Sequence, residues 1–446
     1  MQDSTDKKDD LIGFVMPDDK DKNDDLIDFK VNTKHHIKVI GVGGGGDNAV
    51  GRMYESGIHD VTFVASNTDK QALDASPVPN KLPLGYIGAG GEPEKARKLA
   101  EDHLEDIKKE LAKDIVKDEG NLVFVTAGMG GGTGTGAGPI IAREAKKMDI
   151  LTVGVVTLPF MFEGRFRIDQ ALDGLEEMAK NVDSLLVVNN ERLFDIYPKL
   201  PLTEAFSYAD NTLTSAVKSI ADIINIYGKI ANVDFNDVNR VLKNGGLSVI
   251  STGTGKGESR VTKAIEDAIN SPLLNNIDIY NAKNVLFVFY CSEDKEKAIH
   301  MEEFEEVSEF MSKFHREYIY KWGAAILPDL DDEVKVTILA SGFESPADDT
   351  PEPATDEGAI DARNTLREKY YGKKANKKAA SKQIFHFTGD DFDNEEIISM
   401  VADTPTLKRT ATALKRINDR RKHSEGSEGA RQSQDGQQPQ NEKIEF

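Results

Sequence analysis

The feature that most limits the fold of this chain is a glycine-dense segment that directly follows a strongly apolar one. Leu122–Thr126 runs into Ala127-Gly-Met-Gly-Gly-Gly-Thr-Gly-Thr-Gly-Ala-Gly138. A turn needs only one or two glycines, so this density indicates a backbone that approaches another group closely. Backbone amides and the hydroxyls of Thr133 and Thr135 can surround several phosphate oxygens. Pro139 suits the first turn of a following helix. The segment predicts a phosphate-binding loop between a buried strand and a helix.

A second glycine-rich loop, Gly41-Val-Gly-Gly-Gly-Gly-Asp-Asn48, follows the apolar run Ile37–Ile40. By itself it fits a turn without a ligand, or a dinucleotide loop, nearly as well as a mononucleotide loop. A dinucleotide fold uses one such loop with an acidic residue about 20 positions on. Here two loops end two strands and can hold one polyphosphate from two sides. The nearest approach to a P-loop, Gly253-Thr-Gly-Lys-Gly257, lacks the required Ser or Thr and is interpreted as a strand-to-helix turn.

Short apolar runs alternate with helical patterns through the middle of the chain. The runs expected to form strands are Ile37–Ile40, Val61–Ala65, Leu122–Thr126, Leu151–Thr157 and Ser184–Val188. Apolar strands alternating with helices predict an α/β fold in which a parallel sheet is covered on both faces. Such sheets bind ligands beyond the carboxyl ends of their strands, where both glycine-rich loops would lie.

Composition sets the domain boundaries. The 446 residues are enough for two domains with tails. Residues 1–35 are rich in Asp and Lys and predict a disordered arm, and residues 344–395 contain clustered Pro, Asp and Lys and predict a disordered linker. Residues 424–446 predict a disordered tail. The compact region therefore extends from about residue 36 to residue 343.

Charge and cysteine content restrict the setting. The net charge of -21 argues against nucleic-acid binding as the main function. The single cysteine, Cys291, lies in an apolar run and is expected to be a buried thiol, which fits a reducing compartment. The N-terminus has no signal-peptide pattern, and no apolar run is long enough to cross a membrane. We expect a soluble, cytoplasmic protein.

Five motifs, in order along the chain, resemble those of the tubulin and FtsZ superfamily. They are Ile37–Asn48, Asn67-Thr-Asp69, Gly130-Gly-Gly-Thr-Gly-Thr-Gly136, Phe162-Glu-Gly164 and Asn232-Val-Asp-Phe235. The resemblance implies a Rossmann-like parallel-sheet GTPase domain at 36–205 and a long central helix with a catalytic loop at 206–233. It also implies a smaller mixed-sheet α+β C-terminal activation domain at 234–343.

The same resemblance implies a function. Members bind GTP or GDP with Mg²⁺ and assemble head-to-tail into homopolymers that form the ring at which bacteria divide. The chain is therefore expected at the division site beneath the inner membrane, where membrane-anchoring and regulatory division proteins are its other partners. No protein side chains are assigned as dedicated metal ligands.

The resemblance also assigns the nucleotide contacts. Those expected to bind GTP are Gly43, Gly44, Gly45, Gly46, Asp47, Asn48, Gly131, Gly132, Thr133, Gly134, Thr135, Gly136, Glu163, Arg167, Asn190, Phe206 and Asn211. Glu163 and Arg167 are expected at the ribose and phosphates, and Asn190 and Asn211 at the guanine edge. Phe206 is expected to cover the base, although the apolar stripe of the central helix by itself favours a core position for this ring.

Hydrolysis requires a group that orients water, and neither glycine-rich loop contains one. The candidates lie at the far end of the central helix, in Asn232-Val-Asp-Phe-Asn-Asp237. From the sequence alone, Asn236 or Asp237 more readily caps the helix that follows. A helix of about 25 residues spans about 37 Å, so its two ends cannot serve one nucleotide. The resemblance implies that Asn232, Asp234 and Asp237 complete the catalytic site of a neighbouring subunit.

Three departures from the superfamily pattern leave the hydrolysis rate open. Asp47 places a carboxylate where Gly, Ser or Asn is usual, which should weaken phosphate binding unless a cation compensates. The loop Pro83–Gly91 looks short, and Asp210-Asn211 reverses the common order. A paralogue that binds GTP and co-assembles but hydrolyses it weakly is the alternative.

The C-terminal region carries one more motif. Asp403-Thr-Pro-Thr-Leu-Lys-Arg409 loosely resembles the peptide that docks membrane anchors, and apolar residues at helical spacing follow it among many basic ones. Residues 396–423 are thus predicted to bind an anchor protein, with membrane contact only indirect or weak. A solvated basic patch is the alternative.

Overall fold

The computed structural model describes residues 36–115, 120–199, 201–225, 231–270, 277–294, 296–314, 318–327, 330–343, 356–372, 384–406 and 409–428. The predicted N-terminal arm lies outside these residues, as do residues 429–446 of the predicted tail. The chain divides into two compact units, Met1–Pro351 and Glu352–Phe446. Each unit is described by itself.

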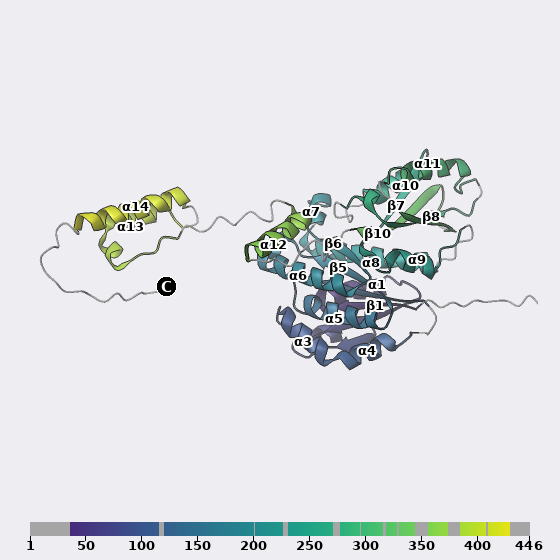
Figure 1. The fold of residues 1–446 in the computed structure, drawn as a ribbon, viewed down its shortest axis with the longest axis horizontal. Coiled ribbons are helices and arrows are strands. Elements are labelled where there is room, and N and C mark those ends of the chain that lie inside the picture. The colour runs from purple at the N-terminus through teal and green to yellow at the C-terminus, as the bar shows by residue number, and fades with distance from the viewer. Residues whose placement is uncertain are drawn as a thin grey trace, which may run out of the picture. The chain divides into compact units, whose positions relative to one another are not determined.

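The first unit is built on one ten-stranded sheet of order β3-β2-β1-β4-β5-β6-β7-β10-β8-β9 (Figure 1). Its strands are β1 His36–Val42, β2 Val61–Asn67, β3 Asn80–Pro83, β4 Asn121–Gly128, β5 Leu151–Leu158, β6 Ser184–Asn189, β7 Gly246–Lys256, β8 Asn284–Cys291, β9 Ile319–Ile326 and β10 Glu333–Phe343. Neighbours from β3 to β7 are parallel, β10 is antiparallel to β7 and β8, and β9 is parallel to β8. The five strands expected from the sequence are confirmed, and the sheet is mixed beyond β7.

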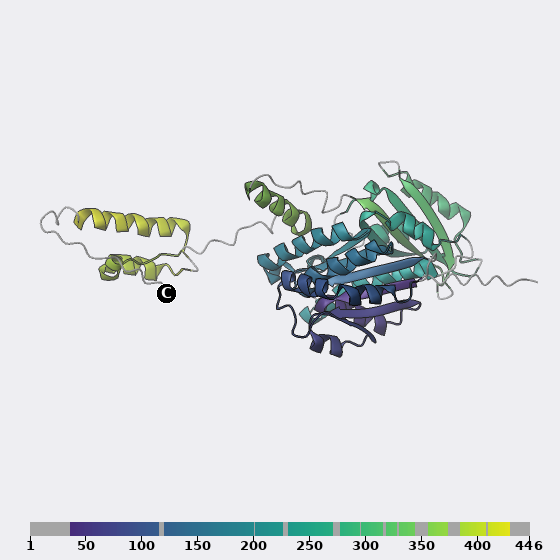
Figure 2. The same cartoon turned by 60° about the horizontal axis from the view of Figure 1, so that its bottom comes forward.

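Helices cover both faces of this sheet, as the apolar strands predicted. They are α1 Gly43–Glu55, α2 Lys70–Ala75, α3 Pro93–Asp102, α4 Leu104–Ala112, α5 Thr133–Lys147, α6 Arg165–Asn181, α7 Arg192–Ile196, α8 Leu202–Asn225, α9 Phe235–Leu242, α10 Arg260–Ile269 and α11 Phe304–Met311. Alternate strand residues such as Ile37 and Val39 join α1, α8 and α9 in one core. Helix α5 packs on β4 and β5 and is flanked by α3, α4 and α6, which are seen from a second side in Figure 2.

The N-terminal and C-terminal halves of the first unit share their sheet. Residues Ser184–Leu186 of β6 pair in parallel with Gly246–Ser248 of β7. The C-terminal half has its own core, in which Phe287 and Phe289 of β8 pack with α10 and α11. Cys291 is buried at the end of β8, as expected. The mixed-sheet C-terminal domain is confirmed, but the sheet that contains it is continuous with the parallel one.

The second unit differs from the sequence prediction. Helix α12 (Asp356–Tyr371) and the short helix η5 (Gly389–Asp393) lie within residues expected to form a disordered linker. The segment of α12 contains many good helix formers, which the Pro- and charge-based prediction overlooked. Helices α13 (Glu395–Asp403) and α14 (Ala411–Glu428) then pack around Phe385, Ile397 and Ile417.

An ion pair also stabilises this small helical unit. The guanidinium of Arg421 lies 2.7 Å from an oxygen of Asp391, whose side chain is nearly fully buried. The same guanidinium lies over the ring of Phe385, 4.4 Å from its centroid. The predicted basic helix is therefore part of a packed arrangement, and helix α14 also includes residues 424–428 of the predicted tail. Leu407 and Lys408 of the predicted anchor peptide lie outside the described residues.

Candidate nucleotide site

The two glycine-rich loops meet at the carboxyl end of the sheet. Gly43 begins α1 with φ of +71°, and a Cβ on it would lie 2.8 Å from the amide nitrogen of Gly134. A Cβ on Gly45 would lie 3.2 Å from the Cα of Gly128. Side chains at these positions would force the loops apart. The predicted juxtaposition of the two loops is therefore confirmed, and the absence of side chains is what permits it.

The glycines of these loops fall into two groups. Cβ atoms on Gly44 and Gly131 would meet nothing within 4 Å among the residues that the structure describes, so both face open space. A Cβ on Gly46 would instead lie 2.4 Å from the carbonyl oxygen of Thr126, and one on Gly136 would lie 2.1 Å from that of Pro93. Gly46 and Gly136 thus serve the packing of α1 on β4 and of α5 on α3, whereas the space next to Gly44 and Gly131 is open.

Two more glycines hold the glycine-rich loop after β4 in place. This loop, residues 130–136, is called the signature loop below. A Cβ on Gly134 would lie 2.5 Å from the carbonyl oxygen of Gly128, and one on Gly132 would lie 2.9 Å from the Cβ of Ala89. Within the described structure, the N-termini of α1 and α5 carry no side-chain caps. Their first-turn N–H groups therefore remain available to an anion.

The two threonines of the signature loop have different partners. The hydroxyl of Thr133 lies 2.7 Å from that of Thr68, which ties this loop to the Asn67-Thr-Asp69 motif. The hydroxyl of Thr135 is buried and accepts a hydrogen bond from the amide of Gly130 at 2.9 Å. Thr135 therefore braces the loop from within, and Thr133 lies at its edge.

The structure gives Asp47 a different orientation from the one expected. Its side chain is 6% exposed and accepts hydrogen bonds from the amide of Ser66 at 3.1 Å and from Nδ2 of Asn67 at 2.7 Å. Burial raises the pKa of this carboxyl to about 7. The carboxyl is directed into the protein beside β2, because the donors at the end of β2 satisfy both of its oxygens. Its repulsion of a phosphate is smaller than the sequence suggested.

Glu163 and Arg167 form the expected pair. Nε of Arg167 lies 3.2 Å from one oxygen of Glu163, and the other oxygen accepts from the amide of Phe160 at 2.8 Å. A Cβ on Gly130 would lie 2.8 Å from the carbonyl oxygen of Arg167, so α6 begins against the signature loop. The half-exposed guanidinium is therefore held at the edge of the glycine-rich loops.

Gln170 is a site residue that the sequence reasoning missed. Its Nε2 lies within hydrogen-bond distance of three carbonyl oxygens, those of Gly91 at 3.0 Å, Gly131 at 3.1 Å and Gly130 at 3.3 Å. It joins the Pro83–Gly91 loop to the signature loop. The sequence contains a signal for this residue, because Gln170 lies three residues after Arg167 and therefore on the same face of α6.

The side expected for the base is aromatic and polar. Phe206 is 43% exposed and meets the ring of Phe160 edge-on, with centroids 5.3 Å apart. The core position that the pattern of the central helix favoured for this ring is therefore wrong. Asn190 is buried, and its Oδ1 has no hydrogen-bond partner among the described residues. Asn211 is exposed on α8. A buried acceptor without a donor among the described residues can bond a base, and an exposed ring can stack on one.

An ion pair between α1 and α8 supports this side. Nε of Arg52 lies 3.1 Å from Asp210, and its Nη2 donates to the hydroxyl of Ser207 at 2.8 Å. Burial raises the pKa of Asp210 to about 6, against the opposing effect of Arg52. The reversed Asp210-Asn211 order thus gives the less exposed of the two positions to the carboxylate, which has a cationic partner.

The segment of residues 232–237, called the Asp loop below, lies at the other end of α8. Asp234 is the N-cap of α9 and accepts from the amide of Asp237 at 3.0 Å, and Asp237 accepts in return from the amide of Asp234 at 3.3 Å. The N-cap is Asp234, and Asp237 caps the helix together with it through this reciprocal capping box, so Asp237 does have the capping role that the sequence alone favoured. Asn232 is exposed. The 24 residues of α8 span about 36 Å, so the Asp loop is remote from its own nucleotide loops.

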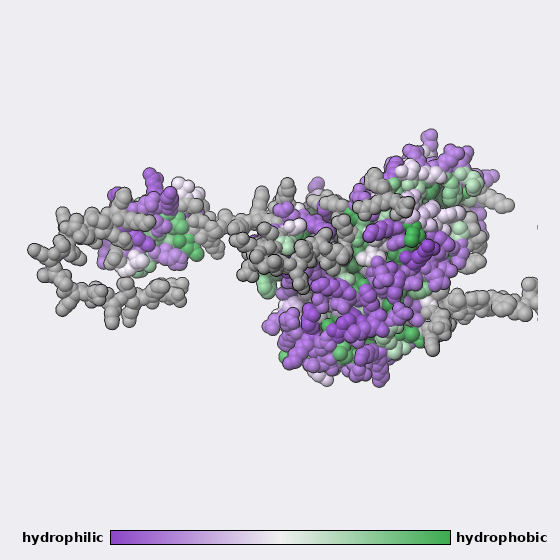
Figure 3. All heavy atoms as spheres, in the orientation of Figure 1, coloured by the Kyte–Doolittle hydropathy of each residue, from purple (hydrophilic) through white to green (hydrophobic). Residues whose placement is uncertain are grey.

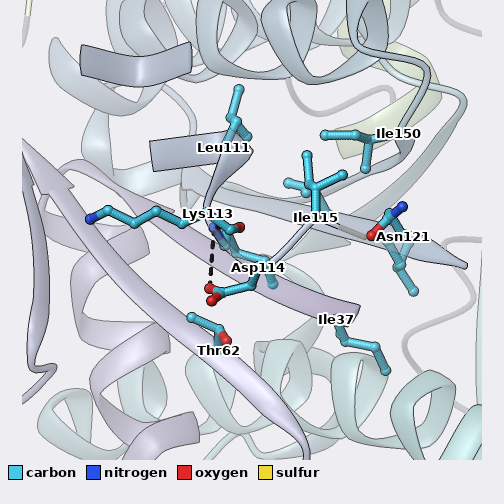
Figure 4. A pocket seen from close by; sticks show the side chains of 11 residues that line it. Ile37, Thr62, Leu111, Lys113, Asp114, Ile115, Asn121 and Ile150 are labelled. Carbon is cyan, nitrogen blue, oxygen red and sulfur yellow. Dashed lines mark hydrogen bonds and ion pairs between the residues drawn. The ribbon is translucent and has the colours of Figure 1, made fainter. Parts of the chain in front are cut away.

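A separate cavity at the opposite end of β1 is too small for a nucleotide (Figure 4). It holds about 20 Å³ and is lined by Ile37, Lys38 and Asp114, among others. The ammonium of Lys38 donates to the carbonyl oxygens of Glu110 at 2.6 Å and Lys113 at 2.8 Å. Lys38 therefore closes the end of α4, and this cavity is a packing feature.

Among the described residues, no group of three or more His, Cys, Asp or Glu side chains is arranged to hold a metal ion. In the same part of the chain, every helix is too short or too polar to span a bilayer.

Comparison with known proteins gives three matching families along the chain. The GTPase domain of the Tubulin/FtsZ family matches residues 36–198, the C-terminal domain of the FtsZ family matches residues 246–344, and a further FtsZ C-terminal family matches residues 379–424. These matches lie in both halves of the first unit and, in the second unit, include η5, α13 and most of α14.

The individual relatives are proteins of the same family as these matches. The chain is 45% identical over 406 residues to the cell division protein FtsZ of Porphyromonas gingivalis, which covers 86% of this chain and 87% of that protein. It is 43% identical over 313 residues to that of Aquifex aeolicus, with 69% and 83% covered. Among solved structures, the empty FtsZ dimer of M. jannaschii is 39% identical with a TM-score of 0.63, and the match covers 72% of this chain and 91% of that one.

Proposed function

The chain belongs to the FtsZ family of tubulin-like GTPases, and from this we propose that its two glycine-rich loops bind GTP while the Asp loop of a neighbouring subunit completes the site. It is a cell-division GTPase that forms protofilaments. The observation that carries the proposal is the position of the Asp loop, at the opposite end of α8 from the glycine-rich loops. Only a second subunit can bring the two together.

The phosphates would lie against Gly44 and Gly131, the two positions that face open space. The uncapped N-termini of α1 and α5 supply N–H donors there, and Arg167 supplies a positive charge at the edge. The Thr133 hydroxyl is an oxygen donor suited to Mg²⁺, but most of the ion's ligands would be phosphate oxygens and water. When bound, the ion would neutralise phosphate charge.

Guanine would occupy the side formed by Phe206, Asn190 and Asn211. The exposed ring of Phe206 offers a stacking surface. The buried acceptor Oδ1 of Asn190 has no donor among the residues that the structure describes, and guanine presents N–H groups on its edge. Because adenine carries its donors and acceptors at different positions, GTP should stabilise the protein more than ATP does.

Hydrolysis would be coupled to assembly. Asp234 and Asp237 lie at the start of α9, away from their own nucleotide, and would reach the γ-phosphate of the next subunit together with Asn232. A carboxylate there can orient the attacking water, and such a group is typically worth about 10²-fold or more in rate. The inward orientation of Asp47 removes one reason to expect the weakly hydrolysing alternative.

The second unit would dock an anchor or regulatory division protein at the division site. Ile384, Phe387, Phe392 and Ile398 are exposed apolar side chains of this unit. Figure 3 shows that the surface of the second unit has a hydrophobic area next to hydrophilic residues. Apolar side chains next to a basic helix suit an amphipathic partner, and membrane contact would then be indirect.

A mixing experiment tests the shared site. Asp237→Ala should bind GTP like the parent but lose most turnover. Gly44→Asp with Gly131→Asp should fold but not bind GTP, since the added carboxylates project into open space and repel phosphate. In mixed filaments, intact pockets of the first variant meet intact Asp loops of the second, so GTPase activity should return. Co-assembly seen by electron microscopy without recovered activity would mean that Asp237 acts within its own chain or not at all.

A further inference from the structure

Strand β9 supports the Asp loop. Ala231 and Ala324 form an antiparallel bridge, with the amide of Ala324 donating to the carbonyl of Ala231 at 2.9 Å and the reverse bond at 3.3 Å. A Cβ on Gly323 would lie 2.3 Å from Cγ2 of Val233. The chain just before Asp234 therefore lies directly against the backbone of β9, at a position that only glycine permits.

Lys321 extends this support to the carboxylate. Its Nζ lies 3.1 Å from Oδ1 of Asp237, and the other carboxylate oxygen accepts the amide of Asp234 at 3.3 Å. The side chain of Asp237 is 19% exposed and that of Lys321 is 47% exposed. Both oxygens of Asp237 are thus engaged, one by its own capping box and one by a cation from a strand more than 80 positions further along the chain.

We propose that Lys321 is a positioning residue for assembly-dependent hydrolysis, holding the carboxylate of Asp237 in the orientation that the nucleotide of the next subunit meets. This inference rests on the proposed role of the Asp loop. An unrestrained Asp side chain samples several rotamers, and a reacting group must be held closely to act efficiently. The ammonium selects one of these rotamers without itself entering the neighbouring pocket.

The role predicts a specific kinetic pattern. Lys321→Met keeps the aliphatic stem and removes the charge, so it should leave GTP affinity and the threshold concentration for assembly unchanged. Turnover per assembled subunit should fall roughly two- to fivefold, the range that corresponds to a partly exposed ion pair. Lys321→Arg should restore most of the turnover, because a guanidinium can pair with the same carboxylate.

The decisive comparison places Lys321→Met in an Asp237→Asn background. If Lys321 acts through Asp237, the double variant should turn over GTP at the same rate as Asp237→Asn alone. A further loss of equal size would overturn the proposal, since the lysine would then act directly on the phosphates. Parent-like turnover of Lys321→Met, or a changed assembly threshold with unchanged turnover, would also overturn it. Full turnover of Asp237→Asn would instead refute the proposed function of the Asp loop, so the two failures are distinguishable.

Discussion

At the scale of single residues, this site is organised by hydrogen bonds between loops. Asp47 accepts a hydrogen bond from Asn67, the last residue of β2, and the hydroxyl of the following Thr68 bonds that of Thr133 in the signature loop. Gln170 joins the signature loop to Gly91. The loops around the candidate site are therefore connected to one another by hydrogen bonds.

Asp47 should make stability depend on pH. Its pKa is about 7 in the folded protein, raised by burial above the ordinary value of 3.8. The folded state thus holds a proton that the unfolded state releases, so stability falls as the pH rises from about 4 to about 7. In the absence of nucleotide, the free energy of unfolding of Asp47→Ser minus that of the parent should increase by about 2–4 kcal/mol from about pH 4 to about pH 8. Urea unfolding at both pH values measures this, and a constant difference would contradict it.

At the scale of elements, the glycine-rich loops combine two tasks that the sequence does not separate. Gly136 permits α5 to pack on α3, and Gly131 faces open space. Both positions lie in the same motif, yet only the second lies where phosphates are expected. Helix α8 separates the nucleotide end of the subunit from the Asp loop by its length.

Alanine at these two glycines should give opposite results. Gly136→Ala should destabilise the protein by about 1–3 kcal/mol, because the added Cβ overlaps the carbonyl of Pro93. Gly131→Ala should unfold at the parent's temperature but bind GTP about tenfold or more weakly, since its Cβ occupies the space of a phosphate. Thermal unfolding without nucleotide and GTP titration measure both variants. Parent-like GTP affinity of Gly131→Ala would place the phosphates elsewhere.

At the scale of the whole molecule, the chain separates a polymerising GTPase from a small helical unit. The first unit holds both ends of the proposed shared site, and the second has its own apolar cluster of Phe385, Ile397 and Ile417. Since each unit has its own core, the loss of one should not unfold the other.

A chain that ends at Pro351 should therefore still bind GTP, form filaments and hydrolyse GTP, but should not be recruited to the division site. Arg421→Met in the full-length chain is the matched control, because it removes the ion pair with Asp391 and leaves the first unit intact. It should reduce recruitment while turnover stays at the parent's value. Fluorescence localisation and GTPase assays measure the two properties. Normal localisation of the truncated chain would show that the second unit is not the docking element.

The sequence by itself determined the fold class, five strands of the parallel sheet and the two glycine-rich loops at its edge. These follow from glycine density and apolar runs, which are local and leave few alternatives. Tertiary structure alone decided the orientation of Asp47, the three contacts of Gln170, the exposure of Phe206 and the pairing of Lys321 with Asp237. Each depends on residues far apart in the chain, and sequence periodicity carries no information about which distant donor meets which acceptor.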